Sequence, residues 1–142
     1  MMTKPKKVVV NLLKNSLHTI VGIDMLATGM ILLTNRRYFF WPPWPAWVMK
    51  AENDIAVGLI GIVIGLGMIY WAVSTKKSIN LNRRLISTAS AYYTLLAATE
   101  ILHGIFAQLR TPHMYTSGLS ELIMVLITLY MAKNSPTNHD DR

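Results

Sequence analysis

The sequence predicts an all-α integral membrane protein, a bundle of four transmembrane helices with both termini in the cytoplasm. The first observation is composition: 52% of the 142 residues are hydrophobic, only 15% are charged, and the mean hydropathy is +0.34. A soluble domain this small could not keep so much apolar surface away from water. The second is that the apolar residues form four long runs, and the third is that basic residues are distributed unequally between those runs.

The four apolar runs set the number of membrane crossings. An α-helix rises about 1.5 Å per residue, so about 20 residues cross about 30 Å of hydrocarbon. With boundary residues added, the predicted spans are 16–35, 55–74, 85–107 and 116–133. Strands are disfavoured because the runs are continuous and lack an alternating pattern. Residues 1–142 are therefore expected to form one four-helix domain that ends in a flexible polar tail, 134–142.

Basic residues predict the orientation of the spans. Ten of them lie in the N-terminal segment, the second loop and the C-terminal tail, against four in the first and third loops. Because cytoplasmic segments carry an excess of Lys and Arg, both termini are expected on the cytoplasmic side of the cytoplasmic (inner) membrane. A cleaved signal peptide is disfavoured, since Lys14 and Asp24 interrupt the first apolar run and no small-residue cleavage site follows.

The lipid bilayer is the expected partner of the charged and aromatic residues. The net charge of +7 resides in short clusters between apolar runs, which indicates contact with lipid headgroups and not with nucleic acid. In the first outer loop, Trp41, Trp44 and Trp47 alternate with three prolines. Aromatic rings favour the headgroup level and prolines prevent a regular helix, so residues 38–47 are expected to lie flat along the outer interface. A docking surface for another membrane protein is the alternative.

Glycines mark a contact face on the second span. Gly58, Gly61 and Gly65 recur at steps of three and four residues and therefore lie on one side of a helix, with Ile62 on another face. Small residues spaced in this way let two helix backbones approach closely. Contact inside the monomer is favoured because the chain has three other helices. A homo-oligomer or a larger membrane complex remains the alternative.

Ionisable residues inside the spans are the candidate functional site. Asp24, Glu100 and Glu121 fall within predicted spans, together with His18 and His103. Such groups are costly in lipid and nearly always face protein or a water-filled cavity. Helical spacing places Glu100, His103 and Glu121 in the outer half of the bilayer, on inward faces of consecutive antiparallel helices. They are interpreted either as polar groups that join helices or as a pathway for protons, cations or water.

A metal site is the third interpretation of the same residues. Glu100 and His103 have the spacing by which di-iron four-helix proteins present two ligands from one helix, but those proteins need the motif twice and two further glutamates. A single zinc or iron held by Glu100, His103 and Glu121 stays open. Haem is disfavoured because His18 belongs to the inner half and His103 to the outer half. No cofactor is expected.

A non-enzymatic function is expected, because no phosphate-binding glycine loop and no Ser-His-Asp arrangement is evident. In length, number of spans, small-residue stripes such as Gly58, Gly61 and Gly65, and its basic N-terminus, the chain resembles the small holin-type proteins of bacteriophages. That resemblance implies oligomeric, channel-like holes in the cytoplasmic membrane, although the tail 134–142 lacks the densely charged C-terminus common in that group. The alternatives are a proton- or cation-coupled small transporter and a non-catalytic scaffold subunit of a larger membrane complex.

Overall fold

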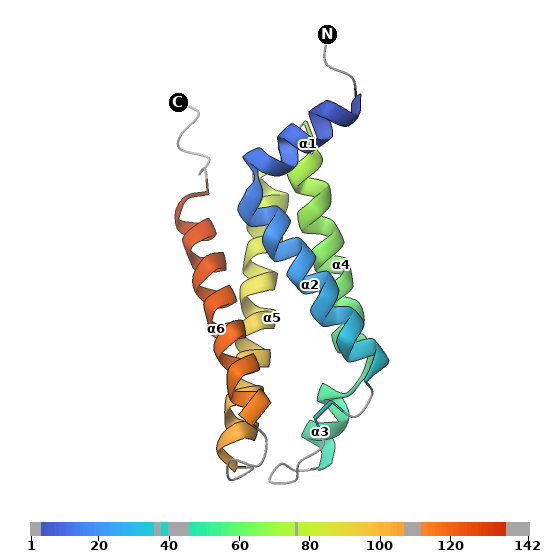
Figure 1. The fold of residues 1–142 in the computed structure, drawn as a ribbon, viewed down its shortest axis with the longest axis vertical. Coiled ribbons are helices and arrows are strands. Elements are labelled where there is room, and N and C mark those ends of the chain that lie inside the picture. Colours follow the sequence, from blue (N-terminus) through green and yellow to red (C-terminus); the bar gives the residue numbers. More distant parts are fainter. Residues whose placement is uncertain (1–3, 36–37, 40–45, 76, 107–111, 136–142) are drawn as a thin grey trace.

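A computed structural model of the chain describes residues 4–35, 38–39, 46–75, 77–106 and 112–135 (Figure 1). These ranges contain no strand, and their helices are α1 (Lys4–Lys14), α2 (Ser16–Thr34), α3 (Ala46–Glu52), α4 (Ile55–Val73), α5 (Ile79–Phe106) and α6 (Pro112–Lys133). The stretches long and apolar enough to cross a membrane are Ser16–Thr34, Lys50–Val73, Ile79–Ile105 and Met114–Lys133. The prediction of an all-helical protein with four such helices is confirmed.

The third long helix begins earlier than predicted. Helix α5 starts at Ile79, so Arg83 and Arg84, which were expected in a loop, are helical. The backbone N–H of Leu81 donates to Ser78 Oγ at 3.3 Å, which satisfies one of the free donors at the helix start. The prediction was wrong here because arginine is a good helix former and its exposed charged head can reach the membrane surface while its stem lies along the helix.

The basic N-terminal segment is also helical, which the apolar runs did not predict. Helix α1 is linked to the C-terminal end of α4 by two asparagines: Asn11 Nδ2 donates to Val73 O, and Asn15 Nδ2 donates to Ala72 O, each at 3.0 Å. The last carbonyl groups of a helix have no partner within it. The side chains of α1 and its turn therefore complete the end of α4 and attach α1 to the bundle.

The aromatic loop departs from the prediction on both sides of its prolines. Helix α3 begins at Ala46, directly after Pro45, and therefore includes Trp47. A proline just ahead of the first helical turn does not obstruct a helix, because N–H groups there have no intrahelical acceptor. Trp47 remains 71% exposed. Trp41 and Trp44 lie outside the described residues.

Phe39, predicted at the interface, is instead part of the core. Only 2% of it is exposed. Its backbone N–H donates to Asn53 Oδ1 at 3.1 Å, and its carbonyl accepts from Asn53 Nδ2 at 2.6 Å. Residues 38–39 therefore turn inward rather than lying flat, because the side chain at the α3–α4 junction replaces the hydrogen bonds that water would otherwise supply.

The long helices form two closely packed pairs, α2 with α4 and α5 with α6 (Figure 1). A Cβ atom added to Gly29 would lie 2.7 Å from Gly58 O, and one added to Gly65 would lie 2.7 Å from Gly22 O. The glycine stripe of α4 thus contacts α2 within one copy of the chain. Gly61 additionally faces α5, where an added Cβ would lie 2.7 Å from the hydroxyl oxygen of Tyr92.

Ile62 does not lie apart from this contact, as the helical spacing predicted. A Cβ on Gly29 would meet Ile62 N and Cγ1 at 2.9 Å. The α2–α4 contact is broader than a single stripe, because two helices in backbone contact each place a residue on either side of the line of closest approach.

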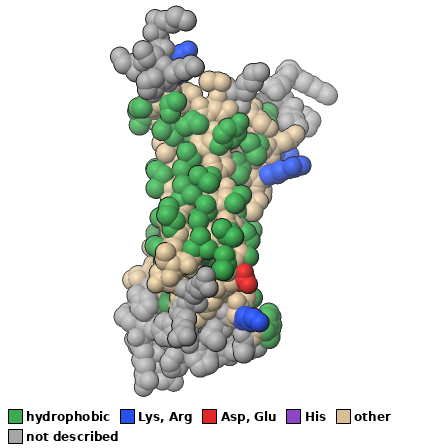
Figure 2. Space-filling model, turned by 90° about the vertical axis from the view of Figure 1, so that its right-hand side faces the viewer, with side chains coloured by type: hydrophobic (Ala, Val, Ile, Leu, Met, Phe, Trp, Pro, Cys, Tyr) green, Lys and Arg blue, Asp and Glu red, His purple; other side chains and the backbone are tan. Residues whose placement is uncertain are grey.

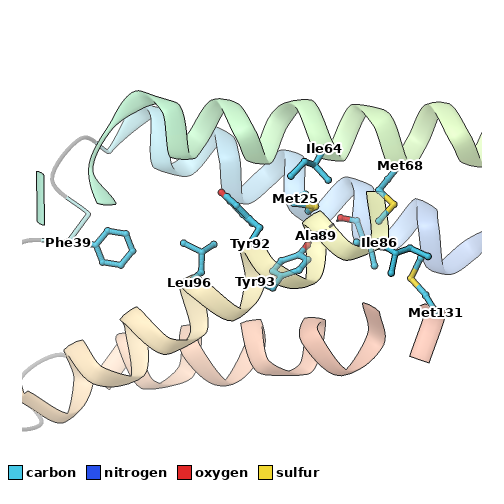
Figure 3. Close-up of a cluster of buried hydrophobic side chains, with 11 residues drawn as sticks. Met25, Phe39, Ile64, Met68, Ile86, Ala89, Tyr92, Tyr93, Leu96 and Met131 are labelled. Atoms are coloured by element: carbon cyan, nitrogen blue, oxygen red, sulfur yellow. Dashed lines mark hydrogen bonds between the residues drawn. The ribbon is translucent and has the colours of Figure 1, made fainter. Parts of the chain in front are cut away.

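The hydrophobic core lies between the two pairs, in a layer that we call the seam (Figure 3). It contains side chains from all four long helices. Several are flexible methionines, which fill irregular gaps. The buried seam residues include Val21, Met25, Ile64, Met68, Ile86, Ala89, Tyr92, Tyr93, Leu96 and Met131.

The outer surface of the bundle is apolar along its middle. Figure 2 shows hydrophobic side chains covering the centre of one face, with the Lys, Arg, Asp and Glu side chains in view toward its two ends. Exposed side chains include Ile23, Val63, Leu126 and Leu129, between 52% and 67% exposed. Such a surface is stable against lipid and costly against water, so the chain is a multi-pass membrane protein.

Helix α1 and the C-terminal end of α6 lie at one end of the bundle, which we call the terminal end, and α3 lies at the other, the α3 end (Figure 1). The basic residues predict that the terminal end is cytoplasmic. A cysteine placed at Ser78 is expected to resist an impermeant thiol reagent in intact cells, and one placed at Ala46 to react. Native cysteines give no background, because the chain has none. Labelling of position 78 from outside would reverse the orientation.

Candidate functional site

The predicted intramembrane acids are buried in or beside the seam. Glu100 and His103 of α5 are 3% and 0% exposed, and Glu121 of α6 is 9% exposed. Glu121 lies within electrostatic range of both Glu100 and Asp24. The structure therefore brings the acids of three different helices into one group, with Asp24 included and His103 on the same inward face of α5 as Glu100.

At the α3 end, the group begins with Tyr38. Its hydroxyl donates to Glu100 Oε1 at 2.9 Å and lies 3.3 Å from Ser117 Oγ. Burial raises the pKa of Tyr38 to about 12. The phenol therefore stays protonated at physiological pH and acts as a hydrogen-bond donor to the carboxyl group.

Near the middle of the bundle, Tyr93 contacts the acid of the first span. The Tyr93 hydroxyl donates to Asp24 Oδ2 at 2.8 Å and also lies 3.3 Å from Val21 O. Asp24 is eight residues from the start of α2, which corresponds to a depth of about 12 Å from that end of the helix. This hydrogen bond joins the two helix pairs across the seam at that depth.

Three polar atoms in this group have no hydrogen-bond partner among the described residues. They are Glu100 Oε2, Glu121 Oε2 and the hydroxyl oxygen of Tyr92. Leaving a buried polar group without a partner costs about 1–3 kcal/mol, and more for a charged group. Native proteins keep few such atoms, and those they keep often have a catalytic or ion-handling role.

A second polar cluster lies at the terminal end. His18 Nε2 is 2.7 Å from Asn82 Oδ1, and Asn82 Nδ2 donates to Ser135 Oγ at 2.6 Å. Because the amide nitrogen of Asn82 is used by Ser135, its oxygen accepts and His18 Nε2 carries the proton. The His18 ring also stacks on Trp71, with 4.2 Å between ring centroids.

Apolar side chains separate the two polar clusters. Asn82 and Tyr93 are eleven residues apart on α5, or about 16 Å along the helix. Between them the seam is filled by Ile86, Ala89 and Met131, which are 2%, 0% and 4% exposed (Figure 3). The polar pathway is therefore interrupted on the terminal side of Asp24.

The structure does not support the metal interpretation of Glu100, His103 and Glu121. Among the described residues, no three His, Cys, Asp or Glu side chains are placed to hold a metal ion together. The Phe39 ring lies beside His103, with 6.3 Å between ring centroids, and Tyr38 occupies one oxygen of Glu100. The spacing of Glu100 and His103 on one helix places them on one face but does not make their donor atoms converge.

Sequence reasoning missed the hydroxyl and amide partners of the acids. Tyr93 shares an inward face with Glu100, seven residues away, so helical spacing could have identified it as a partner. Tyr38 lies in a loop, where no periodic pattern exists. Asn82 was assigned to a loop because two arginines follow it, although it is buried and only 2% exposed.

Comparison of the chain with protein-family models, with curated proteins and with solved structures finds no match. Function must therefore be argued from the site.

Proposed function

We propose that this protein moves protons across its membrane through the carboxyl groups of the seam, as a small proton-conducting or proton-coupled protein. The observation that carries the proposal is the pair of buried oxygens without a hydrogen-bond partner, Glu100 Oε2 and Glu121 Oε2. A carboxyl group that serves only to join helices would be expected to use its oxygens for that purpose. A free oxygen beside a second acid can instead accept and release a proton.

The position of the acids favours a pathway inside one copy of the chain over a hole between copies. Glu100 and Glu121 are 3% and 9% exposed within the monomer. The holin-type resemblance would lead one to expect polar faces available for sharing between subunits. Here the acids turn toward the seam, and large apolar side chains cover the surfaces that neighbouring copies could reach.

Protons fit the site better than metal cations. A proton needs only a chain of titratable and hydrogen-bonding groups, and the seam supplies Tyr38, Glu100, Glu121, Asp24 and Tyr93. A cation stripped of water needs several oxygen ligands around one point, and the described acids do not converge in that way. The apolar stretch between Tyr93 and Asn82 favours gated coupling over an open pore.

The test is proton flux into vesicles that contain the purified protein and a trapped pH-sensitive dye, with the membrane potential clamped. Glu100→Gln, Glu121→Gln and Asp24→Asn are each expected to lower the flux at least tenfold while the protein stays folded, because an amide keeps the shape and hydrogen bonds of the acid but cannot titrate.

Asp54→Asn is the matched control. Asp54 is exposed and lies outside the seam, where its Oδ1 accepts from Ala56 N at 2.8 Å as the cap of α4. Asparagine caps a helix as well as aspartate does, so this variant should keep wild-type flux and stability. Unchanged flux in the double variant Glu100→Gln, Glu121→Gln would defeat the proposal, and equal loss of flux and stability would assign the acids a structural role.

A scaffold subunit is the second candidate, favoured by a groove between α5 and α6. The groove has a volume of about 700 Å³ and opens on the outer surface. Small residues that another helix could pack against line it, among them Ser87, Ser90, Ala91, Thr94 and Ala98. A protein that copurifies with the wild type and is lost on Ala91→Leu would support this role.

A further inference from the structure

A cavity of about 220 Å³ lies at the α3 end, between α3, α4 and α5. Its walls are mostly apolar, and two aromatic rings contribute to them, Phe39 and Trp47. Two polar side chains also line it, Glu52 of α3 and Thr99 of α5. The cavity is separate from the row of acids in the seam, although Phe39 borders both.

Glu52 is the only ionisable residue among those that line this cavity. Its carboxyl group is half-buried and forms a side-chain hydrogen bond with Thr99. No Lys or Arg of the described residues forms an ion pair with it. Lys50 is on the same helix, but residues two positions apart lie on different faces of a helix and cannot pair. The carboxylate charge thus lacks compensation from the described part of the chain.

We propose that this cavity binds a lipophilic organic cation, such as a quaternary ammonium that carries one aromatic ring. An apolar wall favours the hydrocarbon part of such a ligand, and the carboxylate of Glu52 compensates its charge. The faces of Phe39 and Trp47 add attraction for a cation. An anion would meet the charge of Glu52, and a neutral molecule would leave that charge unpaired.

The cavity connects to the seam through two neighbouring residues. Phe39 forms part of its wall and lies beside His103, and Tyr38 donates to Glu100. Thr99, on the opposite wall, directly precedes Glu100 on α5. A bound cation would therefore touch the residues that border the acid group. Its role as the molecule whose movement is coupled to protons rests on the proposed function, but its binding does not.

The test is calorimetric titration of benzyltrimethylammonium into the full chain in nanodiscs of zwitterionic lipid, with empty nanodiscs as the blank. Glu52→Gln is expected to weaken binding at least tenfold, because it removes the charge and keeps the shape. Ala51→Phe should weaken it similarly by filling the cavity while the charge remains. Asp54→Asn removes a nearby exposed carboxylate and should change affinity less than twofold.

Phenylmethanesulfonate, an anion of similar size, is expected not to bind. Equal affinity of wild type and Glu52→Gln for benzyltrimethylammonium would overturn the proposal. Displacement of the cation by neutral neopentylbenzene, with no effect of Glu52→Gln, would also overturn it and would assign the cavity to lipid acyl chains. Proton flux plays no part in this measurement, so binding without flux would refute the proposed function alone, and flux without binding would refute this inference alone.

Discussion

Gly65→Ala is expected to lower the free energy of unfolding by about 1–3 kcal/mol, the usual cost of forcing extra atoms into a packed interface. The added Cβ would lie 2.7 Å from Gly22 O and 3.0 Å from Leu26 N. Both are backbone atoms, so neither can turn aside. The α2 and α4 helices would have to separate along their length, and midpoints of unfolding in sodium dodecyl sulfate would show the loss.

Gly67→Ala is the matched control, because it makes the same change on the same helix. Its Cβ would meet Leu85 Cδ2 at 2.7 Å, and that atom is the end of a flexible side chain. Alanine also favours a helix over glycine by about 0.5–1 kcal/mol. This variant should therefore be neutral or slightly more stable. Equal behaviour of the two variants would mean that the close backbone approach of α2 and α4 is absent.

Tyr93→Phe is expected to destabilise the protein by about 1–3 kcal/mol, since it removes the only donor that the described residues offer to Asp24 Oδ2. The phenyl ring itself fits, because phenylalanine keeps all of tyrosine except the hydroxyl group. The penalty comes from a carboxyl group left without its partner inside the bundle. The same unfolding assay measures it.

Tyr92→Phe, one position earlier, should be neutral or stabilising. Its hydroxyl is buried, and no described residue forms a hydrogen bond with it. Removing a buried polar atom that makes no bond relieves a desolvation cost. Destabilisation by Tyr92→Phe equal to that by Tyr93→Phe would show that Tyr92 has a partner of its own, and would weaken the assignment of Asp24 to Tyr93.

Local patterns predicted the long helices and the inward faces of α4 and α5. About 20 apolar residues in a row leave a membrane helix as the favoured structure, and the periodicity of 3.6 residues placed Gly58, Gly65 and Glu100 on faces that are buried. These properties depend on neighbours within a few positions. They can therefore be read without knowledge of the fold.

Contacts between distant segments could not be predicted in the same way. Tyr38 and Glu100 are 62 positions apart, and nothing near Tyr38 distinguishes a ring that turns inward from one that remains at the membrane surface. Helix α3 was missed because three prolines precede it, and the early start of α5 was missed because hydrophobicity was taken to mark the helix end. The backbone of a helix can continue past the membrane, where charged side chains meet water.

The division into two helix pairs determines which deformations of the bundle cost least. Within the α2–α4 pair, backbones touch at Gly22 and Gly65, and in the α5–α6 pair an added Cβ on Gly118 would lie 3.3 Å from Ala97 O. Sliding either pair internally would drive backbone atoms into one another. Between the pairs, methionine side chains can change rotamer and follow a displacement.

Rocking of one rigid pair against the other is consequently the easiest large motion of this molecule. Such a motion would widen the seam at one end of the bundle while closing it at the other. Asp24 and Tyr93 lie near the middle, close to the pivot, and would exchange contact with the two faces of the membrane without leaving each other.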